Sequence, residues 1–303
     1  MKKRKKVGIA LSGGGARGLA HIGVLKVLQE NHIPIDYIAG TSMGAVIGAF
    51  YSAELNIKKL EREVLDINWK DLFSYHFPVK GLMKSNKIEK FLRSKLGNIT
   101  FDDLTIPLFI TAFDIESKRE IVFTKGDVVK AIRASISIPA LFAPVSNKGR
   151  VLVDGGIVDP VPTEILKEKA DIIIAVNVNK RRIREPILNE EAVSNERDKK
   201  TTVPNILACA AKSLQIFTSE LSTADLIGDE IDFLINVNLE DVSALDFSDS
   251  QRIIKKGEQK AREVIEDIKA TSKPNLFKDF LKELEEAFPV KILRPENLKL
   301  GFK

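Results

Sequence analysis

Short apolar runs alternate with segments of helical periodicity over the first 53 residues. The run 7–11 is followed by apolar positions at helical spacing through about Asn31, and the run 37–39 by a second helical segment that begins near Ala45. A short continuous run is typical of a buried strand, and spacings of three and four residues are typical of a helix. The order strand, helix, strand, helix predicts a parallel sheet with crossover helices.

The same two patterns continue to about residue 271. Further strands are expected at 107–113, 120–123, 151–153, 172–178 and 231–237, and further helices at 57–67, 86–96, 128–136, 163–169, 206–227 and 250–269. The charged stretch 180–203 has almost no periodicity and is interpreted as a surface insertion. We therefore expect one three-layer α/β/α domain over residues 7–271, with a mostly parallel central sheet and its motif-bearing core within 7–178. An amphipathic helix and tail are expected over 272–303.

The composition is that of an ordinary soluble protein. Of the 303 residues, 44% are hydrophobic and 29% are charged, and no apolar run approaches the roughly 18 residues that a membrane span requires. The basic leader 2–6 before the apolar run 7–11 imitates a signal peptide, but that run is too short and ends in glycines. The one cysteine, Cys209, has no partner for a disulfide within the chain. These features favour a cytoplasmic protein.

The net charge of +5 allows two interpretations of the basic segments 2–6 and 180–184. Lysines and arginines in ends and loops are ordinarily solvated, which is the simpler interpretation. The alternative is attraction of these segments to anionic lipid head groups, which would bring the protein to a membrane surface. No basic stripe interleaved with aromatic residues indicates a nucleic-acid partner. The oligomeric state has no signature in the sequence.

The pentapeptide 40–44 has the form G-x-S-x-G, with Ser42 between Gly40 and Gly44. Small residues on either side of a serine allow a sharp turn from strand to helix, which lifts the hydroxyl out of the sheet at the helix N-terminus. The pentapeptide lies between an apolar run and a helical segment rich in small residues, as such an elbow requires. The competing interpretation is an ordinary strand–helix turn in which Ser42 caps the helix.

A serine nucleophile needs a base. The chain contains only three histidines, His21, His32 and His76, so the order serine, acid, histidine cannot be completed with Asp154 as the acid. Asp154 follows the apolar run 151–153, so we expect it at the carboxyl edge of the parallel sheet, where Ser42 would also emerge. The base is then either an earlier histidine or a carboxylate acting directly. A plain Asp-Gly turn is the alternative interpretation of Asp154.

The segment Gly13-Gly14-Gly15-Ala16-Arg17-Gly18 matches G-x-G-x-x-G, the pattern of dinucleotide-binding loops. Asp36, the acid that would bind the ribose, precedes the second apolar run, whereas that role requires it to end the run. No Gly-Lys-Ser/Thr sequence of a nucleotide-binding P-loop is present either. An oxyanion hole explains the glycines and Ser42 together, because backbone N–H groups there would meet the charge that develops on an attacked carbonyl.

The three motifs in this order resemble the patatin-like phospholipase family. They are the glycine loop 13–18, the pentapeptide 40–44, and Asp154-Gly155-Gly156. The segments 135–142 and 18–25 are also similar to that family. The likeness covers residues 7–178, and the combination of the three motifs is far more specific than any one of them.

The resemblance implies a Ser–Asp dyad in which Ser42 is the nucleophile and Asp154 is the general base. It implies an oxyanion-hole loop of Gly13, Gly14, Gly15 and Arg17, with the N–H groups of Gly14 and Gly15 as donors and Arg17 bracing the loop or its charge. Supporting glycines of the motifs are Gly18, Gly40, Gly44, Gly155 and Gly156. His21 is expected to be a packed helix residue.

The implied reaction is hydrolysis of a fatty-acyl ester in a lipid or phospholipid through an acyl-serine intermediate, without a metal or cofactor. Such a substrate suits a cytoplasmic protein that associates peripherally with membranes. Two other functions stay open at this point. The protein could be an acyltransferase or a thioesterase that uses the same acyl-serine intermediate. It could also be a non-catalytic lipid-binding module that retains the fold.

Overall fold

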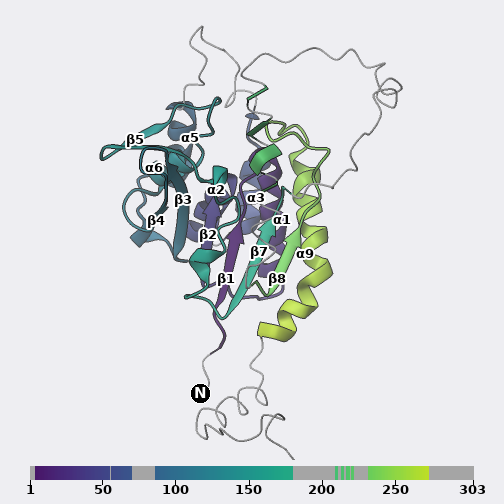
Figure 1. Ribbon diagram of the computed structural model, residues 1–303. Coiled ribbons are helices and arrows are strands. Elements are labelled where there is room, and N and C mark those ends of the chain that lie inside the picture. Colours follow the sequence, from purple (N-terminus) through teal and green to yellow (C-terminus); the bar gives the residue numbers. More distant parts are fainter. Residues whose placement is uncertain are drawn as a thin grey trace, which may run out of the picture.

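The computed structural model describes residues 4–54, 56–69, 86–179 and 231–272, together with isolated positions between 209 and 221. The central feature is an eight-stranded sheet in the order β5-β6-β3-β2-β1-β7-β8, with β4 paired to β3 (Figure 1). The strands are β1 Val7–Leu11, β2 Tyr37–Thr41, β3 Leu108–Asp114, β4 Arg119–Phe123, β5 Val145–Asn147, β6 Arg150–Asp154, β7 Ile172–Asn177 and β8 Phe233–Asn236.

Helices in the described residues connect and cover these strands. The α-helices are α1 Ala20–Glu30, α2 Met43–Glu54, α3 Ile57–Leu65, α5 Asn86–Leu96, α6 Val128–Ser135 and α9 Ser250–Ser272. Short 3-10 turns are η1 Gly15–Leu19, η2 Phe101–Asp103, η3 Gly155–Ile157 and η4 Glu164–Leu166. The predicted helix at 163–169 is thus a single 3-10 turn, because Pro162 and the return to β7 leave little room for a longer one.

The middle of the sheet is parallel. β1 lies between β2 and β7 with Ile9 opposite Ile38 on one side and Ile174 on the other, and β2 continues the parallel arrangement to β3. β8 joins β7 in the same direction. The predicted mostly parallel sheet with flanking helices is therefore confirmed. The exceptions are β4, β5 and β6, which form antiparallel pairs.

Residues of β1 alternate between two hydrophobic layers. Ile9 and Leu11 belong to the large cluster that contains the buried faces of α1, α2 and α9. Ala10 lies in a smaller cluster on the opposite face, together with Val161 and Leu166 from the segment around η4. Successive strand residues point to opposite faces of a sheet, so a continuous apolar run such as β1 requires cover on both.

Helices α1 and α9 are in close backbone contact. A Cβ at Gly23 of α1 would lie 2.0 Å from the Ile254 carbonyl oxygen, and one at Gly257 of α9 would lie 2.0 Å from that of Ala20. Only glycine at these two positions allows the helix backbones to approach so closely. α9, which the sequence places more than 200 residues after α1, is thereby part of the same core.

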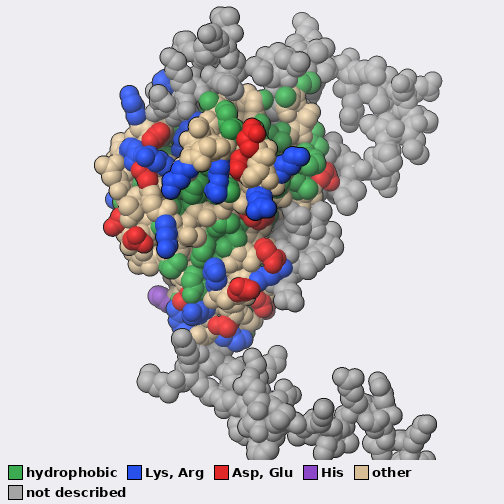
Figure 2. All heavy atoms as spheres, turned by 60° about the vertical axis from the view of Figure 1, so that its left-hand side comes forward, with side chains coloured by type: hydrophobic (Ala, Val, Ile, Leu, Met, Phe, Trp, Pro, Cys, Tyr) green, Lys and Arg blue, Asp and Glu red, His purple; other side chains and the backbone are tan. Residues whose placement is uncertain are grey.

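Several expectations concern residues outside the described ranges. They are the charged insertion 180–203, most of the helix 206–227, and the amphipathic segment 276–288. No helix among the described residues is both long enough and apolar enough to cross a bilayer. On the face shown in Figure 2, Lys and Arg side chains are interspersed with Asp and Glu, so that face has no extended patch of one sign.

Candidate active site

Ser42 lies at the turn between β2 and α2. Its φ is +54°, a left-handed conformation that non-glycine residues seldom adopt, and its side chain is only about 5% exposed. A Cβ at Gly44 would lie 2.1 Å from the Leu11 carbonyl oxygen, and one at Gly40 would lie 2.7 Å from the Ala45 nitrogen. Both glycines of the pentapeptide are thus required by close backbone contacts, and the turn is the strained elbow that the sequence pattern predicts.

The backbone of Ser42 is held by a side chain that the sequence analysis did not single out. The Ser42 N–H donates to Oγ of Ser135, at the end of α6, over 2.8 Å. Both residues are buried, so this bond satisfies an amide that would otherwise lack a partner. A serine 93 positions away along the chain therefore fixes the backbone of Ser42.

Asp154 ends β6, and its carboxyl group lies close enough to the Ser42 hydroxyl for that hydroxyl to lower the pKa of the carboxyl. One carboxylate oxygen, Oδ1, accepts a hydrogen bond from the N–H of Gly156 over 2.8 Å. The residue is about 5% exposed, and this burial raises the pKa of Asp154 to about 6, although the Ser42 hydroxyl and the Gly156 N–H act in the opposite direction. A carboxylate with this pKa is ionised at neutral pH and remains basic enough to accept a proton.

Asp154 reaches Ser42 by a different route from the one predicted. It does not end a parallel strand: β6 runs antiparallel to β3, with Asp154 opposite Ala112. The neighbouring residue Thr111 pairs with Thr41, directly before Ser42. β3 extends past the end of β2, and β6 pairs with this extending part of β3. The pairing brings Asp154, at the end of β6, close to the turn that contains Ser42. The assumption of a parallel strand was wrong because an apolar run does not reveal its direction.

One short segment holds both halves of the dyad. Ser135 binds the Ser42 N–H, and two residues later the Ser137 carbonyl accepts from the Asp154 N–H over 3.0 Å. The side chain of Arg133 fixes this segment: Nη1 donates to Ser137 Oγ over 2.6 Å, and Nη2 donates to the Ala143 carbonyl over 2.9 Å. The separation of Ser42 and Asp154 therefore depends on residues 133–137.

The glycine loop follows β1 and turns into η1. The N–H of Gly13 donates to the Pro160 carbonyl over 3.0 Å, so this member of the loop has its amide group occupied. Across the described ranges, the N–H groups of Gly14 and Gly15 have no protein acceptor. Gly15 has φ +58° and lines the same cavity as Ser42. These two amides fit the role of oxyanion donors.

Arg17 is a buried cation in the same loop. Its side chain is about 6% exposed, its Nε has no partner, and no carboxylate among the described residues pairs with it. Burial lowers the pKa of Arg17 to about 10. Next to it, Gly18 allows η1 to lie against α2, since a Cβ there would be 2.5 Å from Met43. Burying a cation without a paired carboxylate is costly, so a negatively charged group close to Arg17 would be favourable.

No histidine in the described part of the chain is placed to act as the base. His21 is fully buried in α1, where Nε2 lies 2.8 Å from the Ser12 carbonyl oxygen. Burial lowers the pKa of His21 to about 4, so the ring is neutral and donates that bond. His32 is exposed beyond the end of α1, and His76 lies outside the described residues. His21 is thus the packed helix residue that was expected.

An apolar cavity opens beside Ser42. Helices α2, α3 and α5 form much of its wall, with Phe50, Leu60 and Leu92 as representatives. Its charged lining residues, Glu63 and Lys95, form an ion pair in which Lys95 Nζ lies 3.7 Å from Glu63 Oε2. The helices predicted at 57–67 and 86–96 as amphipathic surface elements therefore have a second task, because their apolar faces enclose this cavity.

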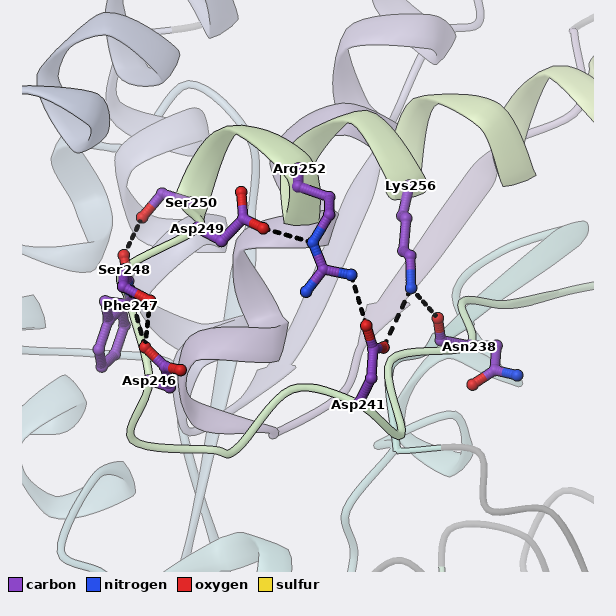
Figure 3. A network of polar contacts seen from close by, with 9 residues as sticks. All are labelled: Asn238, Asp241, Asp246, Phe247, Ser248, Asp249, Ser250, Arg252 and Lys256. Atoms are coloured by element: carbon purple, nitrogen blue, oxygen red, sulfur yellow. Dashed lines mark hydrogen bonds and ion pairs between the residues drawn. The ribbon is translucent and has the colours of Figure 1, made fainter.

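The loop between β8 and α9 closes another side of the site (Figure 3). Arg252 of α9 binds both Asp241 and Asp249, and Lys256 binds Asp241 as well. Figure 3 shows these side chains reaching from the first turns of α9 across to the loop. Exposed ion pairs are individually weak, but here two cations share one carboxylate and hold residues 241–249 against the helix.

This loop contacts both the glycine loop and the cavity. The Ala244 carbonyl accepts from the Ala16 N–H over 2.8 Å, and Leu245 and Phe247 line the cavity. The Phe247 ring stacks on Trp69 with centroids 4.2 Å apart and planes inclined by 13°. The sequence analysis identified none of these residues, because an isolated phenylalanine or alanine in a polar loop carries no distinctive pattern.

Comparison with known proteins is consistent with this geometry. The chain is 37% identical over 178 residues to an uncharacterized NTE family protein of Mycobacterium bovis, and 32% identical over 181 residues to the neuropathy target esterase sws of Drosophila melanogaster. It is 32% identical over 180 residues to the lysophospholipase NTE1 of Yarrowia lipolytica. Each alignment covers 57% of this chain, but only 49%, 13% and 12% of the respective relatives.

The fold is also similar to a solved structure. VipD from Legionella pneumophila superimposes with a TM-score of 0.60 at 13% identity, over 88% of this chain and 67% of that one. The family model described as patatin-like phospholipase matches residues 9–167, just over half of the chain and including all three motifs. On this evidence the chain belongs to the patatin-like phospholipase family.

Proposed function

We propose that this protein hydrolyses long-chain acyl esters of lipids, with Ser42 as nucleophile and Asp154 as general base. The observation that carries the proposal is the placement of the buried Ser42 hydroxyl next to the buried Asp154 carboxylate, beside an apolar cavity. A strained serine, a base with a pKa near 6 and unsatisfied amides in one place suit acyl transfer chemistry.

In the first half-reaction, Asp154 accepts the hydroxyl proton while Ser42 Oγ attacks the acyl carbonyl. The tetrahedral oxyanion accepts hydrogen bonds from the N–H groups of Gly14 and Gly15. Collapse expels the alcohol, which takes the proton back from Asp154, and leaves the acyl-serine. In the second half-reaction Asp154 takes a proton from water, the hydroxide attacks the acyl-serine, and the proton returns to Ser42 as the fatty acid leaves.

The cavity supports a substrate with one long acyl chain. In the described part of the chain, one apolar cavity is lined by Ser42, and each methylene buried there contributes about 0.8 kcal/mol. That is about a fourfold gain per carbon, so esters with longer chains should be preferred until the cavity is filled. The buried guanidinium of Arg17 favours a substrate with negative charge. A lysophospholipid combines these features, and one relative is named a lysophospholipase.

The test measures release of fatty acid from palmitoyl lysophosphatidylcholine and of nitrophenol from short p-nitrophenyl esters. Ser42→Ala should abolish both activities, and Asp154→Asn should reduce kcat by at least 10³-fold, since nucleophile and base are lost outright. The matched control is Ser52→Ala. It also removes a buried serine hydroxyl, but this one lies within α2 and has no hydrogen-bond partner. It should leave kcat within about twofold.

Other results would identify the competing functions or refute the proposal. Activity that survives in Ser42→Ala would exclude Ser42 as the nucleophile. Transfer of the acyl group to an added alcohol at the expense of fatty acid would identify an acyltransferase. A wild-type protein that binds palmitoyl lysophosphatidylcholine without releasing fatty acid, and whose Ser42 is not labelled by a fluorophosphonate, would be a lipid-binding module.

A further inference from the structure

We infer that Asn179 is a positioning residue of the oxyanion hole, which it aligns through the carbonyl group of Gly13. The inference rests on the proposed function, since an oxyanion hole matters only if Ser42 attacks a carbonyl. Asn179 follows β7 and lies beyond residue 167, where the match to the family model ends. The motifs of the sequence therefore do not include it.

The contact is a single buried hydrogen bond. Nδ2 of Asn179 donates to the Gly13 carbonyl oxygen over 2.8 Å, and the residue is about 3% exposed. A carbonyl only accepts, so the amide group of Asn179 must present its NH₂ side to Gly13. The N–H of Asn179 itself donates to Oδ1 of Asn177 over 2.9 Å. This turn at the end of β7 holds the backbone from which the Asn179 side chain reaches the loop.

Fixing the Gly13 carbonyl also fixes the Gly14 N–H. The two groups belong to one planar trans peptide, in which C=O and N–H point in opposite directions. With the Gly13 carbonyl held toward Asn179, the Gly14 N–H must point away from Asn179. The bond from Gly13 N–H to Pro160 anchors the preceding peptide, and the bond from Arg17 N–H to the Gly14 carbonyl anchors the following one.

The Gly13–Gly14 peptide needs such an external anchor. Gly14 has φ +153°, and neither of these residues has a Cβ to restrict rotation of the peptide between them. β1 ends at Leu11, so no ladder hydrogen bond restrains it. Among the described residues, the side chain of Asn179 is what binds this carbonyl. A donor aligned before the reaction stabilises a developing oxyanion without paying for reorientation in the transition state.

The test compares Asn179→Ala and Asn179→Asp with the wild type and with Asn31→Ala. Asn31 is a matched control, because its Nδ2 also donates to a backbone carbonyl over 2.8 Å, but at the far end of α1. Asn179→Asp keeps the shape of the side chain while replacing the donor with an acceptor, so it reports on the bond if Asn179→Ala does not fold. Thermal unfolding identifies the variants that are folded.

Four quantities are measured on each folded variant. They are kcat and KM for a short p-nitrophenyl ester, the inhibition constant of a trifluoromethyl ketone that forms a tetrahedral adduct with Ser42, and the affinity for a non-hydrolysable ether lipid. Loss of one aligned donor costs about 10²–10³ in turnover. Misalignment of one should lower kcat about 10–100-fold and weaken the ketone by a similar factor. KM and the affinity for the ether lipid should change by less than threefold.

A kcat within twofold of the wild type in both Asn179 variants would overturn the inference. So would a loss of thermal stability or of kcat without any change in the affinity for the ketone, because a merely structural role predicts that pattern. Failure of the proposed function is detected by a separate comparison of the wild type with Ser42→Ala. If the proposed function is wrong, the wild type shows no hydrolysis that depends on Ser42.

Discussion

Replacing Asp154 with asparagine should abolish hydrolysis and at the same time stabilise the folded protein, but only at neutral and alkaline pH. Asparagine has the same shape as aspartate, and its Oδ1 can still accept the Gly156 N–H. What it removes is a buried negative charge. An active-site group that is costly to bury is expected to trade stability for activity.

The magnitude follows from the pKa of Asp154, which rises from 3.8 to about 6 on folding because the carboxyl group is buried. Between these two values the unfolded chain has already lost the proton while the folded protein retains it. The unfolded state then binds fewer protons, so the free energy of unfolding falls as the pH rises through this window. Two pKa units correspond to a decrease of about 3 kcal/mol in the free energy of unfolding. This decrease is complete above pH 6, and there is none below pH 3.8.

Asp154→Asn should therefore gain about 3 kcal/mol over the wild type at pH 8, or about 6 °C in Tm for a chain of this size. The gain should disappear near pH 4. Thermal or urea unfolding at pH 4.5, 6 and 8 measures this difference. The kcat/KM of the wild type for a short p-nitrophenyl ester, read at the isosbestic point of nitrophenol, should fall below an apparent pKa of about 6, because a protonated Asp154 cannot act as base.

Asp114→Asn is the matched control on the adjacent strand. Asp114 is also buried, but bonds from Ser117 Oγ and from the N–H groups of Glu116 and Val151 lower its pKa. Its ionised form contributes stability that is lost as the pH falls, so Asp114→Asn should destabilise the protein at pH 8. The apparent pKa of kcat/KM should not move. An Asp154→Asn variant that is less stable than the wild type at pH 8, or a wild-type kcat/KM constant down to pH 4.5, would refute the reasoning.

Two further substitutions test the surroundings of the dyad. Ser135→Ala leaves the buried N–H of Ser42 without an acceptor, which costs about 1–3 kcal/mol of stability, and it should lower kcat at least tenfold with KM nearly unchanged. Recovery of kcat in Ser135→Thr would support this role of the hydroxyl. A wild-type kcat in Ser135→Ala would contradict it. Phe247→Ala opens the wall where its ring stacks on Trp69 and should shift the optimum in a series of acyl chain lengths toward longer esters. A uniform loss at every chain length would show that Phe247 only supports the core.

The sequence by itself determined the local parts of the site. The elbow at Ser42 is readable because its requirements lie within five residues: a strand before it, a helix after it, and glycines where a Cβ would strike backbone. The glycine loop is readable for the same reason, as a run of residues without Cβ between a strand and a turn. The absence of any histidine after His76 excluded a serine, acid, histidine order with Asp154 as the acid.

The direction of β6 could not be read from the sequence. The apolar run 151–153 specifies a buried strand, but the same run fits a parallel or an antiparallel neighbour, and only pairing with the extending part of β3 decided between them. Asp154 lies next to Ser42, as expected, but for a reason that the sequence argument did not contain. The role of Gly13 was likewise decided by tertiary contacts, since only the structure shows that its N–H donates to the Pro160 carbonyl.

The residues that align the chemistry were decided by tertiary structure alone. Ser135 meets the elbow across 93 positions and Asn179 meets the glycine loop across 166. Each is a common polar residue whose identity says nothing about its partner until the sheet brings the two segments together. Local sequence selects the backbone that can carry the nucleophile and the oxyanion donors, because sterics act over a few residues. Which side chain then satisfies each buried amide and carbonyl depends on strand order and register, which only the folded chain sets.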